Sequence, residues 1–245
     1  MSTYAFSDIH GQRKLFDQVM NEIGPNDTVY FLGDAIDRGP DGWAIFKELI
    51  DDPRVIFICG NHEDMMINAL RTFPEIRWSR DMEVWGWNGN YTTLDGIHAD
   101  DPEVVKEYLA RACNLPIFET YTNQFGDIFW LSHAGCDYTE DLTELTREHL
   151  IWDRSHFLSN MWYHDSPDNL YIVHGHTPIP ILLEEMSMYC DDIPRDGEVE
   201  PGAYYYAKGH KICIDCGAHF TDTTVLLSLD TFEEKVFTID EQETN

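Results

Sequence analysis

Five short polar clusters occur in a fixed order along the chain, and each one follows a stretch that is typical of a β-strand. The clusters are DIH at 8–10, GDAIDRG at 33–39, GNHE at 60–63, SHAG at 132–135 and HGHTP at 174–178. Loops at strand ends are where α/β proteins build their active sites. The five clusters therefore predict an α/β fold with one composite polar site.

Eight short runs rich in Val, Ile, Phe and Tyr predict β-strands, and several are apolar throughout, which is typical of strands covered on both faces. The predicted strands are 3–7, 28–32, 55–59, 128–132, 170–173, 211–215, 223–229 and 235–239. Apolar residues at helical spacing predict one helix at 15–23 and another at 43–50. This alternation of strands and helices indicates βαβ units and a sheet that is covered by helices.

Residues 64–125 depart from this alternation. We interpret them as an inserted helical lobe within a single domain that spans residues 1–245. Helices are predicted at 64–72 and near 102–113, with a Trp-rich segment between them.

The aromatic residues of that segment have two interpretations. The favoured interpretation is that these residues pack inside the lobe. The alternative is that they form a platform for substrate; the tryptophans concerned are Trp78, Trp85 and Trp87. Residues 184–210 form a second irregular stretch, which is either a flap over the site or a long hairpin connection.

Composition restricts the classes of function. The 245 residues fit one large domain, and an apolar fraction of 43% supports a sizeable core. The net charge of −29 argues against non-specific nucleic-acid binding, which depends on Lys and Arg. The chain shows neither a leader peptide nor an apolar run of membrane-spanning length. We therefore expect a soluble, cytoplasmic protein that binds neither nucleic acid nor membranes.

The six cysteines are expected to be reduced and mostly buried. Only Cys213 and Cys216 have CxxC spacing, and they lie in a strand-like run. Residues i and i+3 of a strand point to opposite faces, so we do not expect this pair to share a metal.

The polar clusters contain residues that suit a pair of metal ions. Asp8 and His10 are two positions apart at a strand end, so their side chains point the same way and can share one ion. Asp34 ends the next strand, and a carboxylate there can bridge two cations about 3.5–4 Å apart. Further candidate ligands follow later strands at Asn61, His133 and His176. Such oxygen and imidazole donors suit Mn, Fe, Zn or Mg.

The segment around Asp37 and Arg38 fits phosphate chemistry. The planar guanidinium of Arg38 matches phosphate oxygens. Asp37 can accept a hydrogen bond from His62 and fix its tautomer. A turn held by a local ion pair is the alternative for this segment when it is considered alone.

Taken together and in order, these residues resemble the phosphoprotein phosphatase branch of the calcineurin-like metallophosphoesterases. The motifs of that branch are GDxHG, GDxxDRG and GNHE, then a later His and a GHTP-like segment. The resemblance covers residues 5–217, and the short chain is more similar to the bacterial and phage protein phosphatases. It implies a four-layer β-sandwich flanked by helices, with two divalent metal ions. Mn²⁺ is the favoured ion, and Fe, Zn or Mg are alternatives.

The resemblance also implies a role for each matched residue. The implied metal ligands are Asp8, His10 and the bridging Asp34, with Asn61, His133 and His176 for the second ion. The implied catalytic residues are His62 as general acid and Asp37 as its support. The implied phosphate-binding residues are Arg38, Arg154 and Asn61.

Three positions depart from the family pattern. Ser7 stands where the family has Gly, which removes no ligand. His174 lies beside His176 and is an alternative ligand, although His176 fills the matching position and is favoured. His219 stands where the family has an apolar residue, and we interpret it as a surface histidine that can also touch substrate.

The implied activity is hydrolysis of phosphomonoesters by a bridging hydroxide, without a phosphoenzyme. A serine/threonine protein phosphatase, with dual specificity as a variant, is the leading hypothesis, and its partner is a phosphorylated protein or peptide. The first alternative is a dinucleoside polyphosphate hydrolase that acts on diadenosine tetraphosphate. The second is an inactive metal-binding interaction protein, which is disfavoured because every expected polar position is filled. The sequence makes no prediction of the oligomeric state.

Overall fold

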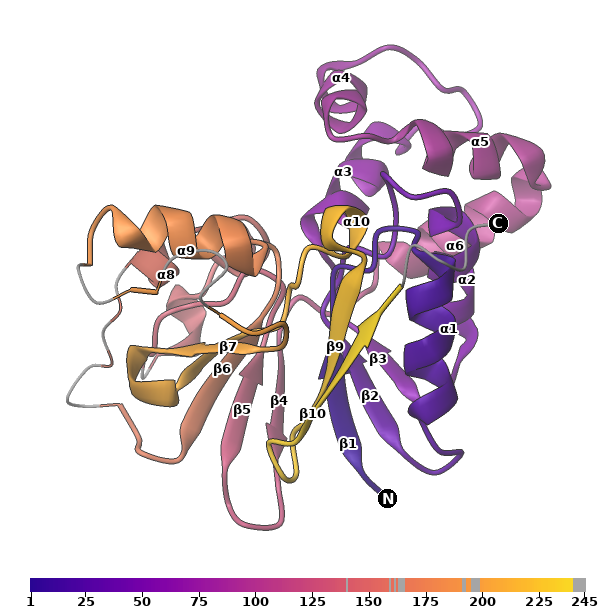
Figure 1. Cartoon of the computed structure of the whole chain (residues 1–245). Coiled ribbons are helices and arrows are strands. Elements are labelled where there is room, and N and C mark those ends of the chain that lie inside the picture. The colour runs from indigo at the N-terminus through magenta and orange to yellow at the C-terminus, as the bar shows by residue number, and fades with distance from the viewer. Residues whose placement is uncertain are drawn as a thin grey trace.

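The computed structural model describes residues 1–139, 141–158, 160, 162, 166–190, 193–194 and 199–239. Within these residues the chain forms two five-stranded β-sheets (Figure 1). The first sheet contains β1 (Thr3–Phe6), β2 (Thr28–Phe31), β3 (Val55–Phe57), β9 (Thr223–Ser228) and β10 (Glu234–Thr238), in the order β10-β9-β1-β2-β3. The second contains β4 (Glu119–Thr122), β5 (Ile128–Leu131), β6 (Leu170–His174), β7 (Tyr204–Tyr206) and β8 (Lys211–Cys213), in the order β4-β5-β6-β8-β7.

Parallel pairing in both sheets places the loops of the site. Strands β1, β2 and β3 are parallel, and so are β5, β6 and β8. Two helices connect the first three strands, α1 (Arg13–Glu22) and α2 (Gly42–Asp51). The apolar face of α1 is buried through Leu15, Phe16 and Val19, which explains why its helical spacing was visible in the sequence.

The core consists of layers between and outside the two sheets. Between the sheets, Ala5 and Leu32 of the first half lie in one cluster with Leu131 and Val173 of the second. On the outer face of the first sheet, the phenylalanines of β1–β3 pack with those of α1 and α2. Outside the second sheet, a smaller cluster surrounds Trp130. This layered α/β arrangement confirms the predicted fold class.

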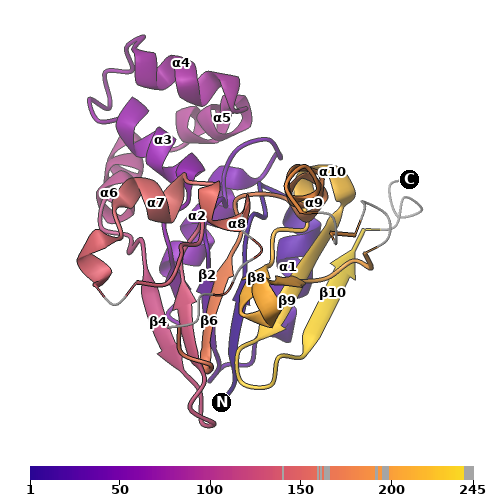
Figure 2. The ribbon, with the colours of Figure 1, turned by 90° about the vertical axis from the view of Figure 1, so that its left-hand side faces the viewer.

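Four helices lie between β3 and β4 in the sequence: α3 (Asn61–Ala69), α4 (Arg80–Trp87), α5 (Tyr91–Ala99) and α6 (Pro102–Ala112). The first three lie beyond the carboxyl ends of β1–β3 in both views of the ribbon, and α6 lies beside α2, where Arg111 contacts Ile50 and Asp51 (Figures 1 and 2). Helix α3 begins three residues earlier than the predicted helix at 64–72. The range 64–125 also ends with a strand, because β4 pairs with β5 and belongs to the second sheet. Its alternating, half-exposed side chains do not form the apolar run that marked the other strands.

The remaining helices are short. They are α7 (Arg147–Ile151), α8 (Ser155–Leu158), α9 (Ile179–Ser187) and α10 (Ala218–Thr221), with 3-10 turns at Leu142–Glu144 and Ala207–Gly209. The stretch at 184–210 contains the end of α9 and all of β7, while 191–192 and 195–198 lie outside the described residues. All six cysteines are free thiols, four of them buried. Among the described helices, none combines the length and apolar character that crossing a bilayer requires.

Candidate metal centre

Loops that follow parallel strands of both sheets converge on one buried cluster. In the first sheet, Asp8, Asp34 and Asn61 follow β1, β2 and β3. In the second sheet, His133 and His176 follow β5 and β6. All five side chains are buried. The fold therefore brings together residues that are as many as 168 positions apart, as are Asp8 and His176.

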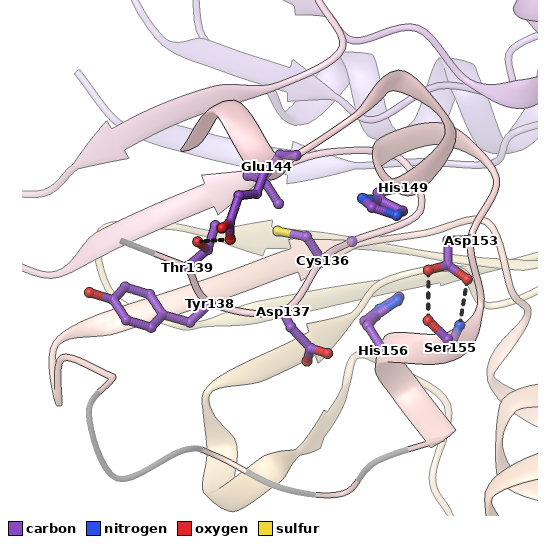
Figure 3. Close-up of a pocket in the computed structure, with 11 residues that line it drawn as sticks. Cys136, Asp137, Tyr138, Thr139, Glu144, His149, Asp153, Ser155 and His156 are labelled. Atoms are coloured by element: carbon purple, nitrogen blue, oxygen red, sulfur yellow. Dashed lines mark hydrogen bonds between the residues drawn. The ribbon is translucent and has the colours of Figure 1, made fainter. Parts of the chain in front are cut away.

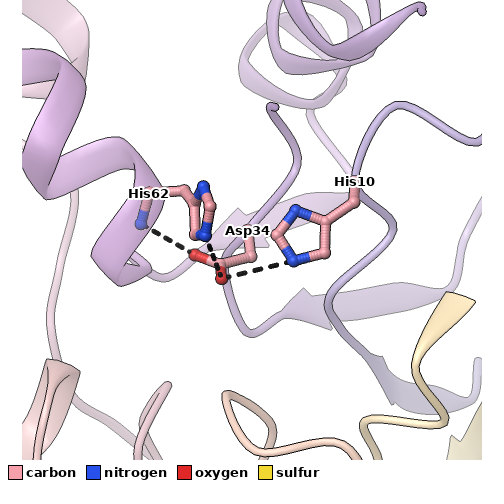
Figure 4. A group of neighbouring side chains, drawn as sticks. All are labelled: His10, Asp34 and His62. Atoms are coloured by element: carbon pink, nitrogen blue, oxygen red, sulfur yellow. Dashed lines mark hydrogen bonds and ion pairs between the residues drawn. The ribbon is translucent and has the colours of Figure 1, made fainter. Parts of the chain in front are cut away.

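The carboxylate of Asp34 occupies the middle of this cluster. Its Oδ2 atom lies 3.6 Å from His10 Nε2 and 3.8 Å from His62 Nε2 (Figure 4). Its Oδ1 atom lies 3.5 Å from His133 Nε2. Each carboxylate oxygen thus faces a different set of imidazoles, which is the arrangement that a bridging ligand requires.

The side chain of Asn61 gathers the donors that come from the second sheet. Its Oδ1 atom lies 2.8 Å from His133 Nε2 and 3.0 Å from His176 Nδ1. Those two imidazole nitrogens are 3.2 Å apart. The backbone N–H of His176 donates to both carboxylate oxygens of Asp8 at 3.1 Å. The second half of the cluster is therefore joined to the first through direct contacts.

The donor set fits divalent metal ions. The Nδ1 atoms of His10 and His133 contact the carbonyl oxygens of Ile36 and Leu32 at 2.8 and 2.7 Å. Their Nε2 atoms are thereby directed at Asp34, and metal-binding histidines are commonly oriented in this way. Two groups have ligand atoms within 4.8 Å of one another, and Asp34 belongs to both: His10, Asp34 and His62, and Asp8, Asp34 and His133.

Electrostatics in the cluster also favour a bound cation. Burial and then the charge of Asp215 raise the pKa of Asp8 well above its usual value. Burial likewise raises the pKa of Asp215 to about 7. Burial alone would raise the pKa of Asp34, but the adjacent imidazoles lower it overall. Desolvation lowers the pKa of the neighbouring imidazoles, namely His10, His133 and His176. Divalent ions would relieve this crowding of buried carboxylates.

The backbone of the site is unusual. Six residues of the polar clusters have a positive φ between 42° and 71° although none is glycine: Asp8, His10, Asp34, Asp37, Arg38 and His176. Such conformations cost about 1–3 kcal/mol each and persist only where the surrounding structure fixes them. Their concentration in the loops of the polar clusters is typical of functional sites.

A chain of buried hydrogen bonds holds His62. Its Nδ1 atom lies 2.6 Å from Asp37 Oδ2, and Asp37 is completely buried. The same Oδ2 atom accepts the indole N–H of Trp85 at 2.7 Å, and Oδ1 accepts the hydroxyl of Thr93 at 2.6 Å. Burial would lower the pKa of His62, but Asp34 and Asp37 outweigh it and raise the pKa. The lobe therefore supplies two donors that fix the carboxylate behind this imidazole.

Two arginines approach the cluster from different loops. Arg38 Nη1 lies 2.8 Å from His10 Nε2, and Arg38 Nη2 lies 3.2 Å from His62 Nε2. Arg154 Nε lies 3.4 Å from His176 Nε2. Both guanidinium groups thus reach the imidazoles of the site, where a phosphate could be held between them.

The two extra histidines have different surroundings. His174 Nε2 lies 2.8 Å from the hydroxyl of Tyr206, and its Nδ1 lies 3.0 Å from the carbonyl oxygen of Gly175. These contacts direct it away from the contacts that His176 makes. His219 Nδ1 lies 3.3 Å from Arg38 Nη1, so this histidine borders the site, where the sequence interpretation allowed it to touch substrate.

Several supporting residues were missed in the sequence. The carboxylate of Glu63 accepts backbone N–H groups of Asp34, Ala35 and Gly60 at 2.8–3.0 Å and so joins two loops. A glutamate in the first turn of a helix is a capping-box signal that could have identified it. Trp85 and Thr93 offered no such local signal, because their partner Asp37 is about 50 residues away in the sequence.

A separate polar cavity of about 270 Å³ lies next to the loop that carries Arg154 (Figure 3). On one side of it, Asp153 accepts hydrogen bonds from the Ser155 amide at 2.9 Å and the Ser155 hydroxyl at 2.6 Å. On the other side, the Thr139 hydroxyl donates to Glu144 at 2.7 Å. The bonds between Asp153 and Ser155 fix the start of α8 and therefore the backbone from which Arg154 extends.

The chain belongs to the calcineurin-like phosphoesterase family, whose profile matches residues 1–213. Metallophosphoesterases of this family use divalent metals, which agrees with the donor set of the cluster. This match confirms the family resemblance that the ordered motifs indicated.

Three known proteins illustrate the similarity. Serine/threonine-protein phosphatase 2 of Escherichia coli is 26% identical over 154 residues, which are 61% of this chain and 66% of that enzyme. The symmetrical bis(5'-nucleosyl)-tetraphosphatase of Nitrosomonas europaea is 34% identical over 67 residues, 26% of this chain and 25% of that enzyme. A metallophosphoesterase structure from Sphaerobacter thermophilus aligns with a TM-score of 0.57 at 17% identity, covering 98% of this chain and 88% of that one. The chain covers less than two thirds of the length of either of the two curated relatives.

Proposed function

We propose that this hydrolase is a protein phosphatase that removes phosphate from phosphoserine and phosphothreonine, with dual specificity as a variant. The observation that carries the proposal is the position of Asp34, whose two oxygens face different imidazoles of the cluster. Arg38 contacts His10 and Arg154 contacts His176, so two guanidinium groups border the same cluster. A pair of ions bridged by one carboxylate, next to guanidinium groups, is suited to a phosphate ester.

We assign the first ion to Asp8 and His10, and the second to Asn61, His133 and His176, with Asp34 shared between them. When bound, two divalent ions would lower the pKa of water to supply a nucleophile at neutral pH and would neutralise phosphoryl charge. Mn²⁺ is the favoured ion, and Fe, Zn or Mg are alternatives, because the donors are oxygens and imidazoles.

The other residues act on the substrate. Arg38 and Arg154 would bind phosphoryl oxygens and stabilise the charge that develops on them, with help from the amide of Asn61. His62 would give a proton to the leaving oxygen, and its raised pKa suits that role. Asp37 would keep the imidazole oriented through its 2.6 Å contact with Nδ1.

The chemistry of the chain favours phosphoproteins over dinucleoside polyphosphates. The E. coli phosphatase matches 61% of the chain, whereas the tetraphosphatase of Nitrosomonas matches 26%. A surface with a net charge of −29 also repels a polyphosphate more strongly than a singly phosphorylated peptide. Hydrolysis of diadenosine tetraphosphate is the second candidate, because the similarity to that relative is higher where the two align.

Metal-stripped protein would test the proposal. Mn²⁺-dependent phosphate release would be measured on a phosphothreonine peptide and on diadenosine tetraphosphate, with wild type, Asp34→Asn and Asp168→Asn. Asp168 is exposed and lies outside the centre, so it controls for the same chemical change. We expect faster release from the peptide, loss of metal and activity in Asp34→Asn, and neither loss in Asp168→Asn. Preference for the nucleotide, or full activity in Asp34→Asn, would overturn the assignment.

A further inference from the structure

A second cavity, of about 480 Å³, lies directly beside Arg38. Its lining includes Trp87 from the end of α4, Tyr91 from the start of α5, and His219. Arg38 also contacts His10 and His62, so this residue borders both the cavity and the candidate metal centre. The roles in metal binding, phosphate binding and catalysis that are proposed above use neither Trp87 nor Tyr91.

The two aromatic side chains of this cavity are unusually exposed. Trp87 is 76% exposed and Tyr91 is 62% exposed, whereas Trp85, only two residues before Trp87, is completely buried. The indole of Trp85 is already engaged with Asp37. The rings of Trp87 and Tyr91 therefore contribute little to the core of the lobe. They line an open space next to Arg38, a candidate phosphate-binding residue.

The backbone fixes these rings relative to Arg38. The amide N–H of Arg38 donates to the carbonyl oxygen of Gly89 at 3.0 Å, so the turn between α4 and α5 is attached to the arginine loop. The side chain of Asn88 donates to the carbonyl oxygen of Val84 at 2.8 Å and closes the end of α4. The turn next to Trp87 and Tyr91 and the loop that carries Arg38 are thus hydrogen-bonded to each other. Ligand pockets are usually preformed in this way.

The charges in the cavity select among possible ligands. Arg38 is the single Lys or Arg among the residues that line it, and the other polar side chains include Gln12 and Asn88. A ligand with one phosphate and a nearby planar ring can satisfy one guanidinium and two aromatic faces. A chain of several phosphates would need more cationic partners than this lining offers.

We propose that the cavity lined by Trp87 and Tyr91 binds an aromatic side chain that flanks the phosphorylated residue of a peptide substrate. The proposal rests on the proposed protein-phosphatase function and adds to it a preference in the substrate sequence. Trp87 and Tyr91 are specificity-determining residues in this proposal, and they take no part in the reaction itself.

The test uses two phosphoserine peptides that differ only in having Phe or Ala beside the phosphoserine. Their shared leaving group keeps the chemistry constant, so the ratio of the two kcat/KM values reports recognition alone. The ratio of the two Kd values is also measured, by fluorescence anisotropy of labelled peptides on metal-loaded proteins that also carry His62→Ala, because this change should slow turnover during the titration. Wild type is compared with Trp87→Ala, Tyr91→Ala and Trp87→Phe, and with Trp78→Ala, because Trp78 is 79% exposed and does not line the cavity.

We expect wild type to prefer the Phe peptide by about fivefold to tenfold, as aromatic pairs contribute in other proteins. Trp87→Ala and Tyr91→Ala should bring the ratio towards one, Trp87→Phe should restore much of it, and Trp78→Ala should leave it at the wild-type value. Wild-type protein that processes the Phe and Ala peptides with equal kcat/KM would overturn the proposal. So would a wild-type ratio of the two kcat/KM values in both Trp87→Ala and Tyr91→Ala.

Two further outcomes separate this proposal from the proposed function. If wild type hydrolyses neither peptide, the protein-phosphatase assignment fails, and the Kd ratio still decides whether the cavity binds the ring. If Trp87→Ala weakens the binding of diadenosine tetraphosphate more than the binding of the Phe peptide, the ring that occupies the cavity is a nucleobase. The peptide assignment is then wrong.

Discussion

Replacing Trp85 by Phe tests whether the helical lobe positions His62, the proposed general acid. The change keeps a buried ring and deletes the N–H that donates to Asp37 Oδ2 at 2.7 Å. Asp37 then keeps two side-chain partners, His62 Nδ1 and Thr93 Oγ1, both at 2.6 Å. Because Trp85 and Asp37 are completely buried, bulk water does not replace the lost donor.

The structure sets the size of the expected effect. A hydrogen bond to a charged group contributes about 1.5–3 kcal/mol, and the smaller ring adds a cavity cost of about 1 kcal/mol. We therefore expect the free energy of unfolding to fall by about 3 kcal/mol in Trp85→Phe. If the whole bond is lost from the transition state, kcat/KM falls by roughly 10–150-fold. Manganese content should stay at the wild-type level, because no proposed metal ligand is changed.

Trp43→Phe is the matched control. The buried indole of Trp43 also donates to a carboxylate, Asp100 Oδ2 at 3.0 Å, but this pair lies outside the metal centre. Urea unfolding, metal analysis and kcat/KM on a phosphothreonine peptide would be measured for both variants. We expect both to lose stability and Trp85→Phe alone to lose activity. Wild-type kcat/KM in Trp85→Phe, or an equal loss in Trp43→Phe, would refute the positioning role.

Three more perturbations follow from the site. His62→Ala should lower kcat by about 10²–10⁴-fold with metal content kept, and full turnover of a substrate with a poor leaving group would contradict the general-acid role. A methyl group in Gly175→Ala would meet the Asp8 carboxylate, so calorimetric Mn²⁺ affinity should fall, whereas Gly86→Ala meets nothing within 4 Å and should bind normally. Burial lowers the pKa of His174 to about 4 in the folded protein. As the pH falls below 6.5, the imidazole of His174 is therefore protonated in the unfolded chain before it is protonated in the folded one, which favours unfolding. The stability of wild type relative to His174→Gln should therefore shrink by about 2 kcal/mol from pH 7 to pH 5 in urea unfolding, and a constant difference would exclude the shift.

Eight of the ten described strands could be predicted from the sequence, and among them are the edge strands β3 and β10. The ends of these eight differ from the predictions by one or two residues. The missed strands, β4 and β7, are the two edges of the second sheet. The residues of β4 alternate between half exposed and exposed, two of the three residues of β7 are half exposed, and the pairing of these strands with β5 and β8 depends on the tertiary fold.

The site was predictable to the extent that its residues stand at strand ends. Asp8, Asp34 and Asn61 could be found because each follows a buried apolar run. Trp85 and Thr93 could not be found, because nothing near them in the sequence indicates that they bond to Asp37. Their role exists only once the lobe has folded against the first sheet. The three tryptophans of the Trp-rich segment also differ in burial, since Trp85 is buried while Trp78 and Trp87 are exposed.

The proposed metal ligands come from both sheets, and this affects the stability of the contact between the two sheets. Asp8, Asp34 and Asn61 come from one sheet, and His133 and His176 come from the other. Ions bound among them would act as a further cross-link between two halves of the core that also adhere through apolar contacts and hydrogen bonds. A ligand present at 100 times its Kd adds about 2.7 kcal/mol to folding stability. Chelation should therefore lower the melting temperature as well as the activity, and the availability of metal would determine how long the enzyme survives in addition to how fast it works.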